Sequence, residues 1–213
     1  MKKIKERPAG IIWAEFARDH DLTEQQEIQF QRYEQFMSEK NKVMNLTAIT
    51  DLAGIVRNHF ADSLAVQKFY DFSKPGLTIC DVGTGAGFPL IPLKIMYPNL
   101  SLLLIEVTRK KREYLEELCK VLEFDDKVEI YSLDWRTFLR TTDYPVDLFV
   151  TRAALGEVEL CRAFKPSSPY RTKQIIYWVS EEWQADVKCI EFVKKQVAYK
   201  LGVKRRKLAF LGC

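Results

Sequence analysis

Residues 77–89 read LTICDVGTGAGFP, a short apolar run that ends in a glycine-rich turn. A run of this kind is typical of a buried parallel strand. Glycines let the chain turn tightly and let a ligand lie directly against the backbone. Pro89 suits the first turn of a following helix, because its missing N–H needs no partner there. The segment therefore predicts a strand, a turn able to bind a ligand, and a helix, in that order.

The alternation of strands and helices continues toward the C-terminus. Strands are expected at SLLLIE (101–106), KVEIYS (127–132), VDLFVT (146–151) and QIIYWV (174–179), with weaker ones at FVKKQVAYK (192–200) and RKLAFLG (206–212). Strands that alternate with helices form a parallel sheet covered on both faces. The last two, joined near Gly202, read as an antiparallel hairpin at one edge. We predict a Rossmann-like α/β fold of about seven strands.

The first 70 residues read as helices. Thr23 followed by Gln26 is a capping-box pattern, and apolar residues then recur at helical spacing. A second helix is expected over residues 51–70, and DFSKPG (71–76) reads as a linker. The sequence thus predicts an N-terminal helical cap, residues 1–70, on a Rossmann-like core, residues 71–213.

Composition excludes several classes of protein. No apolar run approaches the roughly 18–20 residues that span a bilayer, and Glu6, Pro8 and Glu15 interrupt any signal-peptide core. We therefore expect a cytoplasmic protein with no membrane partner. The five cysteines show no CxxC or zinc-ligand spacing and there are two histidines, so no metal is expected.

The net charge of +4 permits an anionic partner without demonstrating one. Basic residues cluster at Lys2–Arg7, Arg109–Arg112 and Lys204–Lys207. Each cluster reads as a solvated face, the last as an exposed hairpin.

The spacing of the glycines discriminates between cofactors. Dinucleotide enzymes use GxGxxG, whereas the third glycine here comes one residue early, which disfavours a nicotinamide dehydrogenase. Asp81 stands two residues before Gly83 and suits the cationic aminoacyl end of a ligand without phosphates. Glu106 follows Gly83 by 23 residues, at the end of the next strand, where a carboxylate can bind both ribose hydroxyls. A tight turn without a ligand is the plainer alternative, but these two carboxylates favour an S-adenosyl-L-methionine site.

The sequence has no GxSxG, no HExxH and no P-loop. Methyl transfer needs none of them when the acceptor already carries a free lone pair, because the sulfonium is activated by its own charge. The protein then has to hold acceptor, methyl group and leaving sulfur in line. Positioning of this kind supplies ~7–11 kcal/mol.

From about Tyr33 to Phe210 the sequence resembles the bacterial 16S ribosomal RNA guanine-N7 methyltransferases, historically called glucose-inhibited division protein B. Three motifs in the right order carry the resemblance: NKVMNLT (41–47), RNHFADSL (57–64) and DVGTGAGFPLIPL (81–93). The family methylates N7 of a guanosine in small-subunit ribosomal RNA. Guanine N7 needs no deprotonation and so no general base.

The resemblance implies roles for named residues. The donor would be held by the carboxylates and turn residues Asp81, Gly83, Gly85, Gly87, Phe88 and Glu106. Asp134, Trp135 and Arg136 would lie at the adenine. Arg152 would orient donor or guanine in the active site. The partner would be ribosomal RNA or the small ribosomal subunit, bound by a monomer.

Two further residues are candidates for catalysis. Asp62 would stabilise the cationic product base. His59 would line the cleft between cap and sheet, or be a helix residue bonded to Asp62 or to backbone. The tryptophans 135, 178 and 183 are expected in the core or stacked on a base.

The sequence departs from the family pattern at three places. Leu90 replaces a glycine, and Asp134 and Arg136 exchange the usual charges. The segment PSSPYRTK after Lys165 replaces a GG turn, and Trp178 and Val179 replace Lys-Gly after the fifth strand; this region is expected to shape the acceptor side. Two alternatives stay open: a methyltransferase with another acceptor, and a catalytically inactive homologue that binds RNA or the ribosome.

Overall fold

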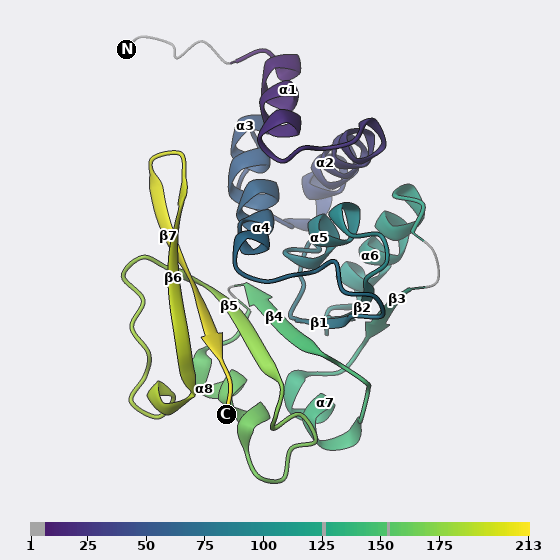
Figure 1. Cartoon of the computed structure of the whole chain (residues 1–213). Coiled ribbons are helices and arrows are strands. Elements are labelled where there is room, and N and C mark those ends of the chain that lie inside the picture. Colours follow the sequence, from purple (N-terminus) through teal and green to yellow (C-terminus); the bar gives the residue numbers. More distant parts are fainter. Residues whose placement is uncertain (1–6, 125–126, 153) are drawn as a thin grey trace.

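The computed structural model describes residues 7–124, 127–152 and 154–213, so the basic cluster Lys2–Arg7 lies outside it except for Arg7. Its centre is a seven-stranded sheet of order β3-β2-β1-β4-β5-β7-β6 (Figure 1). The strands are β1 (Thr78–Val82), β2 (Ser101–Ile105), β3 (Val128–Tyr131), β4 (Leu148–Arg152), β5 (Gln174–Ser180), β6 (Val193–Leu201) and β7 (Lys204–Leu211). β1 to β5 are parallel, whereas β7 runs antiparallel to both of its neighbours. The predicted α/β fold and its edge hairpin are confirmed.

Helices cover both faces of the sheet (Figure 1). They are α1 (Ala9–Asp19), α2 (Glu24–Met44), α3 (Leu52–Ile55), η1 (Val56–Ala61), α4 (Asp62–Leu64), η2 (Ala65–Lys68), α5 (Leu90–Met96), α6 (Arg109–Val121), α7 (Trp135–Thr141), α8 (Glu157–Leu160), η3 (Cys161–Phe164) and η4 (Ile190–Phe192). The capping box is present, with the Gln26 N–H donating to Thr23 Oγ1 and the Thr23 N–H to Gln26 Oε1. Within the described residues, no helix combines the length and the apolar character needed to cross a membrane.

The helix predicted over residues 51–70 is present as an unbroken helical stretch from Leu52 to Lys68, but its type changes along the chain. α3 is followed by the π-helical η1, then by α4 and the 3-10 helix η2. Polar side chains bond back to the backbone here: Asn58 Nδ2 to the Gly54 carbonyl and Ser63 Oγ to the His59 carbonyl. Such bonds compete with regular α-helix geometry. Short π-helical insertions in helices are frequent at functional sites.

The cap and the sheet share one hydrophobic core. Phe30 and Tyr33 of α2 pack against Phe60 of η1, with ring centroids 5.1 and 5.2 Å apart, and Tyr33 also stacks on Phe88 after the glycine turn. Leu90, at the start of α5, is completely buried in the same cluster. The position that is usually glycine in the resembling family therefore accommodates leucine here. A second core, on the other face, packs α7 and α8 against the sheet.

Candidate active site

The carboxyl ends of β1 and β4 form the centre of the candidate site. From β1 the chain proceeds to β2 and β3 on one side of the sheet, and β4 and β5 lie on the other. Open α/β sheets bind ligands at such a switch point. The glycine turn follows β1, Glu106 follows β2, and Arg152 ends β4. The fold brings these predicted residues to one edge.

The glycine turn needs glycine for two different reasons. Gly83, Gly85 and Gly87 all have positive φ, +74°, +60° and +101°. A Cβ on Gly83 would lie 2.3 Å from the Cβ of Ala154, and one on Gly87 would lie 2.7 Å from Tyr33 Oη. A Cβ on Gly85 would meet nothing within 4 Å. Packing thus accounts for Gly83 and Gly87, whereas Gly85 leaves its backbone open to a ligand.

Glu106 fixes the turn from the side of β2. Its Oε2 accepts from the Gly85 N–H at 3.2 Å and its Oε1 from the Thr108 N–H at 2.8 Å. A carboxylate offers about four lone-pair positions, so this one retains capacity for further donors. It can bind hydroxyl groups without releasing the turn.

Asp81 lies beneath the turn and is completely buried. Burial raises the pKa of its carboxyl group to about 8. Among the described residues, no group meets hydrogen-bond geometry with either of its oxygens or with Thr84 Oγ1, although the Thr84 hydroxyl and the Leu90 N–H lie close enough to lower the Asp81 pKa. Buried polar groups are nearly always satisfied, and an unpaired one is unfavourable. Asp81 therefore has the properties of a group that a cationic ligand would pair.

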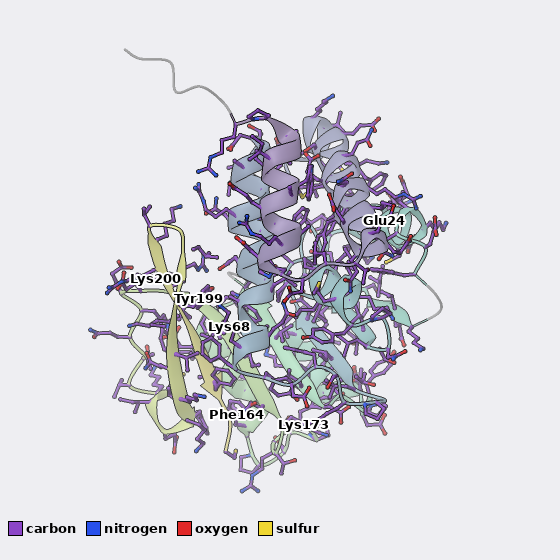
Figure 2. The ribbon with its side chains drawn as sticks, turned by 45° about the horizontal axis from the view of Figure 1, so that its top comes forward. Glu24, Lys68, Phe164, Lys173, Tyr199 and Lys200 are labelled. Atoms are coloured by element: carbon purple, nitrogen blue, oxygen red, sulfur yellow. The ribbon has the colours of Figure 1, made fainter. Side chains whose placement is uncertain are left out.

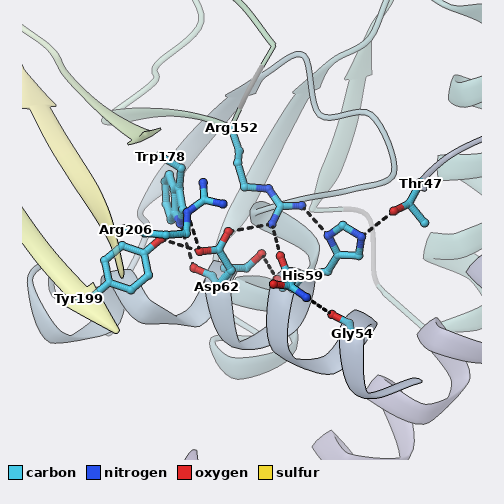
Figure 3. A network of polar contacts seen from close by, with 10 residues as sticks. Thr47, Gly54, His59, Asp62, Arg152, Trp178, Tyr199 and Arg206 are labelled. Carbon is cyan, nitrogen blue, oxygen red and sulfur yellow. Dashed lines mark hydrogen bonds and ion pairs between the residues drawn. The ribbon is translucent and has the colours of Figure 1, made fainter. Parts of the chain in front are cut away.

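Arg152 is the centre of a polar network (Figure 3). Its Nη1 donates to the Asn58 carbonyl at 3.0 Å and to Asp62 Oδ2 at 3.1 Å, and its Nη2 lies 3.1 Å from His59 Nδ1. The guanidinium also lies over the Phe88 ring, 4.9 Å from its centroid. Arg152 thus connects β4, η1 and the glycine turn.

His59 is held as a neutral ring. Arginine can only donate, so Nδ1 accepts from Arg152 and the proton is on Nε2, which donates to Thr47 Oγ1 at 2.8 Å. Burial, with Arg152 adding to it, lowers the pKa of His59 to about 4. The ring stacks on Phe88, with centroids 4.6 Å apart. His59 therefore bonds to Arg152 and Thr47, and its geometry suits positioning better than proton transfer.

Asp62 is completely buried, and both of its carboxylate oxygens are engaged. Oδ2 binds Arg152, while Oδ1 accepts from Tyr199 Oη at 2.5 Å and lies 3.4 Å from Arg206 Nε. The indole N–H of Trp178 donates to the Asp62 carbonyl. Three residues from β5, β6 and β7 thus anchor Asp62, and sequence reasoning missed two of them, Tyr199 and Arg206. Tyr199 lies directly opposite Arg206 in the hairpin, and residues that are directly opposite point to the same face of a sheet. Only this pairing could have indicated that the two side chains act together.

Asp134, Trp135 and Arg136 follow β3 at the same edge but lie outside the Arg152 network. Asp134 caps α7 by accepting from the Thr137 N–H. Trp135 is buried against Phe138 and Phe149, and its indole N–H donates to the Glu159 carbonyl. Arg136 forms a bidentate pair with Glu159, at 2.7 and 2.8 Å. The exchanged charge at Arg136 therefore has its own partner on α8.

Two apolar residues at this edge were not predicted. Val107 comes directly after Glu106, beyond the end of β2, and Leu133 comes directly before Asp134. Their exposed fractions are 57% and 52%, which is high for large apolar side chains. The carboxyl ends of β2 and β3 thus carry an exposed apolar surface.

The segment after Lys165 packs against α7. Residues 165–173 lead into the amino end of β5, and Lys165 and residues 167–169 line a pocket together with Asp134 and Arg136. Tyr170 of this segment is buried and stacks on Phe138. The expectation that this region shapes the acceptor side stays a prediction. Trp178 and Val179, near the carboxyl end of β5, lie toward the active-site edge.

Comparison with known proteins identifies the family to which the chain belongs. The family model described as GidB, rRNA small subunit methyltransferase G, matches residues 26–204. Ribosomal RNA small subunit methyltransferase G of Staphylococcus aureus strain JH9 is 44% identical over 119 residues, which cover 54% of this chain and 49% of that protein. The protein of strain Newman matches to the same extent. The chain spans about half the length of the curated relatives it matches.

Solved structures of methyltransferases and related proteins share the fold. The mitomycin 7-O-methyltransferase MmcR has a TM-score of 0.55 at 17% identity, covering 85% of this chain and 60% of that one. MtNAS, in complex with MTA and tNA, has a TM-score of 0.54 at 14% identity, covering 94% and 81%. TrmK of M. capricolum, in complex with S-adenosyl-homocysteine, has a TM-score of 0.52 at 12% identity, covering 70% and 66%. At these identities the likeness concerns the fold alone.

The family match extends from α2 of the cap to the first residue of β7, and so includes the glycine turn, Glu106 and Arg152 with its partners His59 and Asp62. It covers well over half of the chain. This chain is therefore a member of the GidB family, rRNA small subunit methyltransferase G.

Proposed function

We propose that this protein transfers a methyl group from S-adenosylmethionine to N7 of a guanosine in small-subunit (16S) ribosomal RNA. The observation that carries the proposal is the glycine turn, with the unpartnered carboxyl group of Asp81 beneath it and the carboxylate of Glu106 beside it. Family membership supplies the acceptor. The protein would act in the cytoplasm, where bacterial ribosomal RNA is found, and as a monomer.

The residues at the carboxyl edge fit the donor. The open backbone at Gly85 allows the donor to approach closely, and Asp81 would pair its cationic aminoacyl end. Glu106 would accept from the ribose hydroxyls. The exposed side chains of Val107 and Leu133 offer apolar surface to an adenine ring, whereas Trp135 is committed to the core and would contribute only its backbone. When bound, the donor supplies a methyl group activated by the sulfonium charge.

The residues around Arg152 suit an acceptor that needs no general base. Guanine N7 has a free lone pair, and the neutral His59, with a pKa of about 4, would remain unprotonated throughout the reaction. Arg152 lies between Phe88 and the cap, where it can orient donor and base together. Asp62 would act through Arg152, because its carboxylate is enclosed by protein. The acceptor base has to be unstacked to reach the methyl group.

Titration calorimetry of the purified protein with S-adenosylmethionine, and separately with NAD, tests the donor. Saturable binding of the first alone is expected. Methylation of naked ribosomal RNA, of small subunits and of a protein fraction then tests the acceptor. Methyl transfer to protein or small molecules alone would refute the proposed acceptor, and absence of donor binding by the folded protein would refute the enzyme.

A further inference from the structure

The positive charge of the protein is concentrated in the β6–β7 hairpin. Residues 193–207, VKKQVAYKLGVKRRK, contain seven Lys and Arg and no Asp or Glu. The other 198 residues hold 26 Lys and Arg against all 29 Asp and Glu, a net charge of −3. The overall charge of +4 therefore arises from this one hairpin.

The tip of the hairpin projects beyond the active-site edge of the sheet. Pairing between β5 and β7 ends at Ser180 and Arg206, whereas pairing between β6 and β7 continues to Leu201 and Lys204. Since β5 is parallel to β4, its last residue marks the edge at which Arg152 lies. Figure 1 shows the two-stranded tip extending past the end of β5, beside α3 and α4. The most basic part of the chain is thus at the edge where an acceptor would arrive.

The charged side chains of the tip are accessible. Lys200, Lys204 and Arg205 are exposed, and Val203 at the turn is completely exposed. Arg205 has Glu181 as an acidic neighbour, with 3.6 Å between Nη1 and Oε1. Figure 2 places Lys200 and Tyr199 together on β6, with Lys68 of η2 nearby. The tip therefore presents cations to solvent, and Tyr199 beside them anchors the hairpin to Asp62.

A groove between the hairpin and the cap limits where an anion can bind. Its volume is about 1630 Å³, and its basic lining residues are Lys200 from the hairpin and Arg7, Arg57 and Lys68 from the cap. The cap also contributes four acidic residues, Glu15, Asp19, Asp21 and Asp51. The charges that line the groove are therefore balanced, whereas residues 193–207 of the hairpin carry positive charge alone, which favours a polyanion at the hairpin.

We propose that Lys200, Lys204 and Arg205 form a docking site for the phosphate backbone of the substrate RNA. The proposal rests on the proposed function for the identity of the RNA. Phosphate contacts position a nucleic acid and provide most of the salt-dependent affinity. Tyr199 and Arg206 then connect the docked hairpin, through Asp62, to Arg152. RNA held at the tip is thus held by the same element that supports the active-site arginine.

The test compares two triple variants with the same change in charge. K200Q/K204Q/R205Q neutralises the tip, and K74Q/K120Q/K188Q neutralises three exposed lysines on other elements. Binding of a transcript of small-subunit ribosomal RNA is measured by fluorescence anisotropy at several salt concentrations. Each phosphate contact in single-stranded RNA contributes ~0.7 to the slope of log K against log salt, so the tip variant should lower this slope by about 2 and weaken binding about tenfold. The control should change neither by a comparable amount.

Two further measurements distinguish the outcomes. Thermal unfolding and titration with S-adenosylmethionine should be the same in both variants and in the wild type, which shows that fold and donor site are intact. Equal losses of RNA affinity in both variants, or an unchanged slope in the tip variant, would overturn the docking site. Hairpin-dependent RNA binding without methylation of any RNA would instead refute the proposed function and leave the docking site standing.

Discussion

Substitutions in the glycine turn should separate packing from ligand access. Gly83 and Gly85 both have positive φ, and an alanine in that conformation costs ~1–2 kcal/mol. Only at Gly83 would the new Cβ collide, at 2.3 Å from Ala154 Cβ, and overpacking of this kind adds ~1–3 kcal/mol. We expect Gly85→Ala to lower the free energy of unfolding by about 1–2 kcal/mol and Gly83→Ala by about 2–5 kcal/mol.

The collision can be removed without restoring glycine. In an Ala154→Gly background the nearest atom to the new Cβ is the Cα of residue 154 at 3.6 Å, an ordinary contact. Gly83→Ala should there destabilise by about as much as Gly85→Ala does, ~1–2 kcal/mol. Urea unfolding of the four proteins in this double-mutant cycle measures the difference. A cost of Gly83→Ala that is the same in both backgrounds would refute the packing argument.

The substitution with the smaller effect on stability, Gly85→Ala, should have the larger effect on donor binding. A Cβ on Gly85 enters the open space over the turn, where the donor is proposed to lie. Gly85→Ala should therefore weaken binding of S-adenosylmethionine in calorimetry although it is the milder change in stability. Undiminished affinity of this variant would place the donor elsewhere.

Three other predictions follow from the buried polar groups. Tyr199→Phe removes a hydrogen-bond donor to a buried carboxylate, so we expect the free energy of unfolding to fall by about 2 kcal/mol and Tm to fall by ~4–8 °C in a thermal scan. Tyr177→Phe, which removes a hydrogen bond to the Leu155 carbonyl, is the matched control and should have a smaller effect. Burial lowers the pKa of His59 from 6.5 to about 4, so between these pH values the unfolded chain binds a proton that the folded chain does not, and stability should fall as the pH drops through that range. His59→Gln should reduce this fall, measured by urea unfolding at pH 7 and pH 5. An equal fall in both proteins would contradict the argument. The pKa of buried Asp81 is raised to about 8, so pairing with the cationic donor should release a proton at pH 7, and the binding enthalpy should then depend on the ionisation enthalpy of the buffer. Asp81→Asn should abolish this buffer dependence. A wild-type binding enthalpy that is the same in all buffers would argue against the pairing.

Local pattern predicted the parts of the fold that local forces determine. The strand before Gly83, the capping box at Thr23 and the hairpin near Gly202 each depend on residues close together in sequence, and each is confirmed. The helix expected over residues 51–70 is confirmed for residues 52–68, but its π-helical and 3-10 turns were not predicted. Side chains bond back to the backbone there, and Arg152 binds the Asn58 carbonyl from 94 residues away.

The site residues that belong to a sequence motif or follow a predicted strand could be predicted, whereas those contributed by the C-terminal hairpin could not. Glu106 and Arg152 lie at the expected edge because parallel strands end together. Tyr199 and Arg206 carry no motif, and their role depends on which face of an edge hairpin is turned toward η1. Val107 and Leu133 were missed because an exposed apolar residue has no signature in the sequence.

The bond between Tyr199 and Asp62 joins residues 137 positions apart. During synthesis at ~5–20 residues per second, Asp62 precedes Tyr199 by roughly 7–30 s. Throughout that interval the carboxylate can pair with neither Tyr199 nor Arg206, and Arg152 emerges well before both. Helical cap and parallel strands can therefore collapse together on the ribosome before the environment of Arg152 is complete. The network around Arg152 is completed in a late step, when the hairpin pairs with β5 and Tyr199 reaches Asp62.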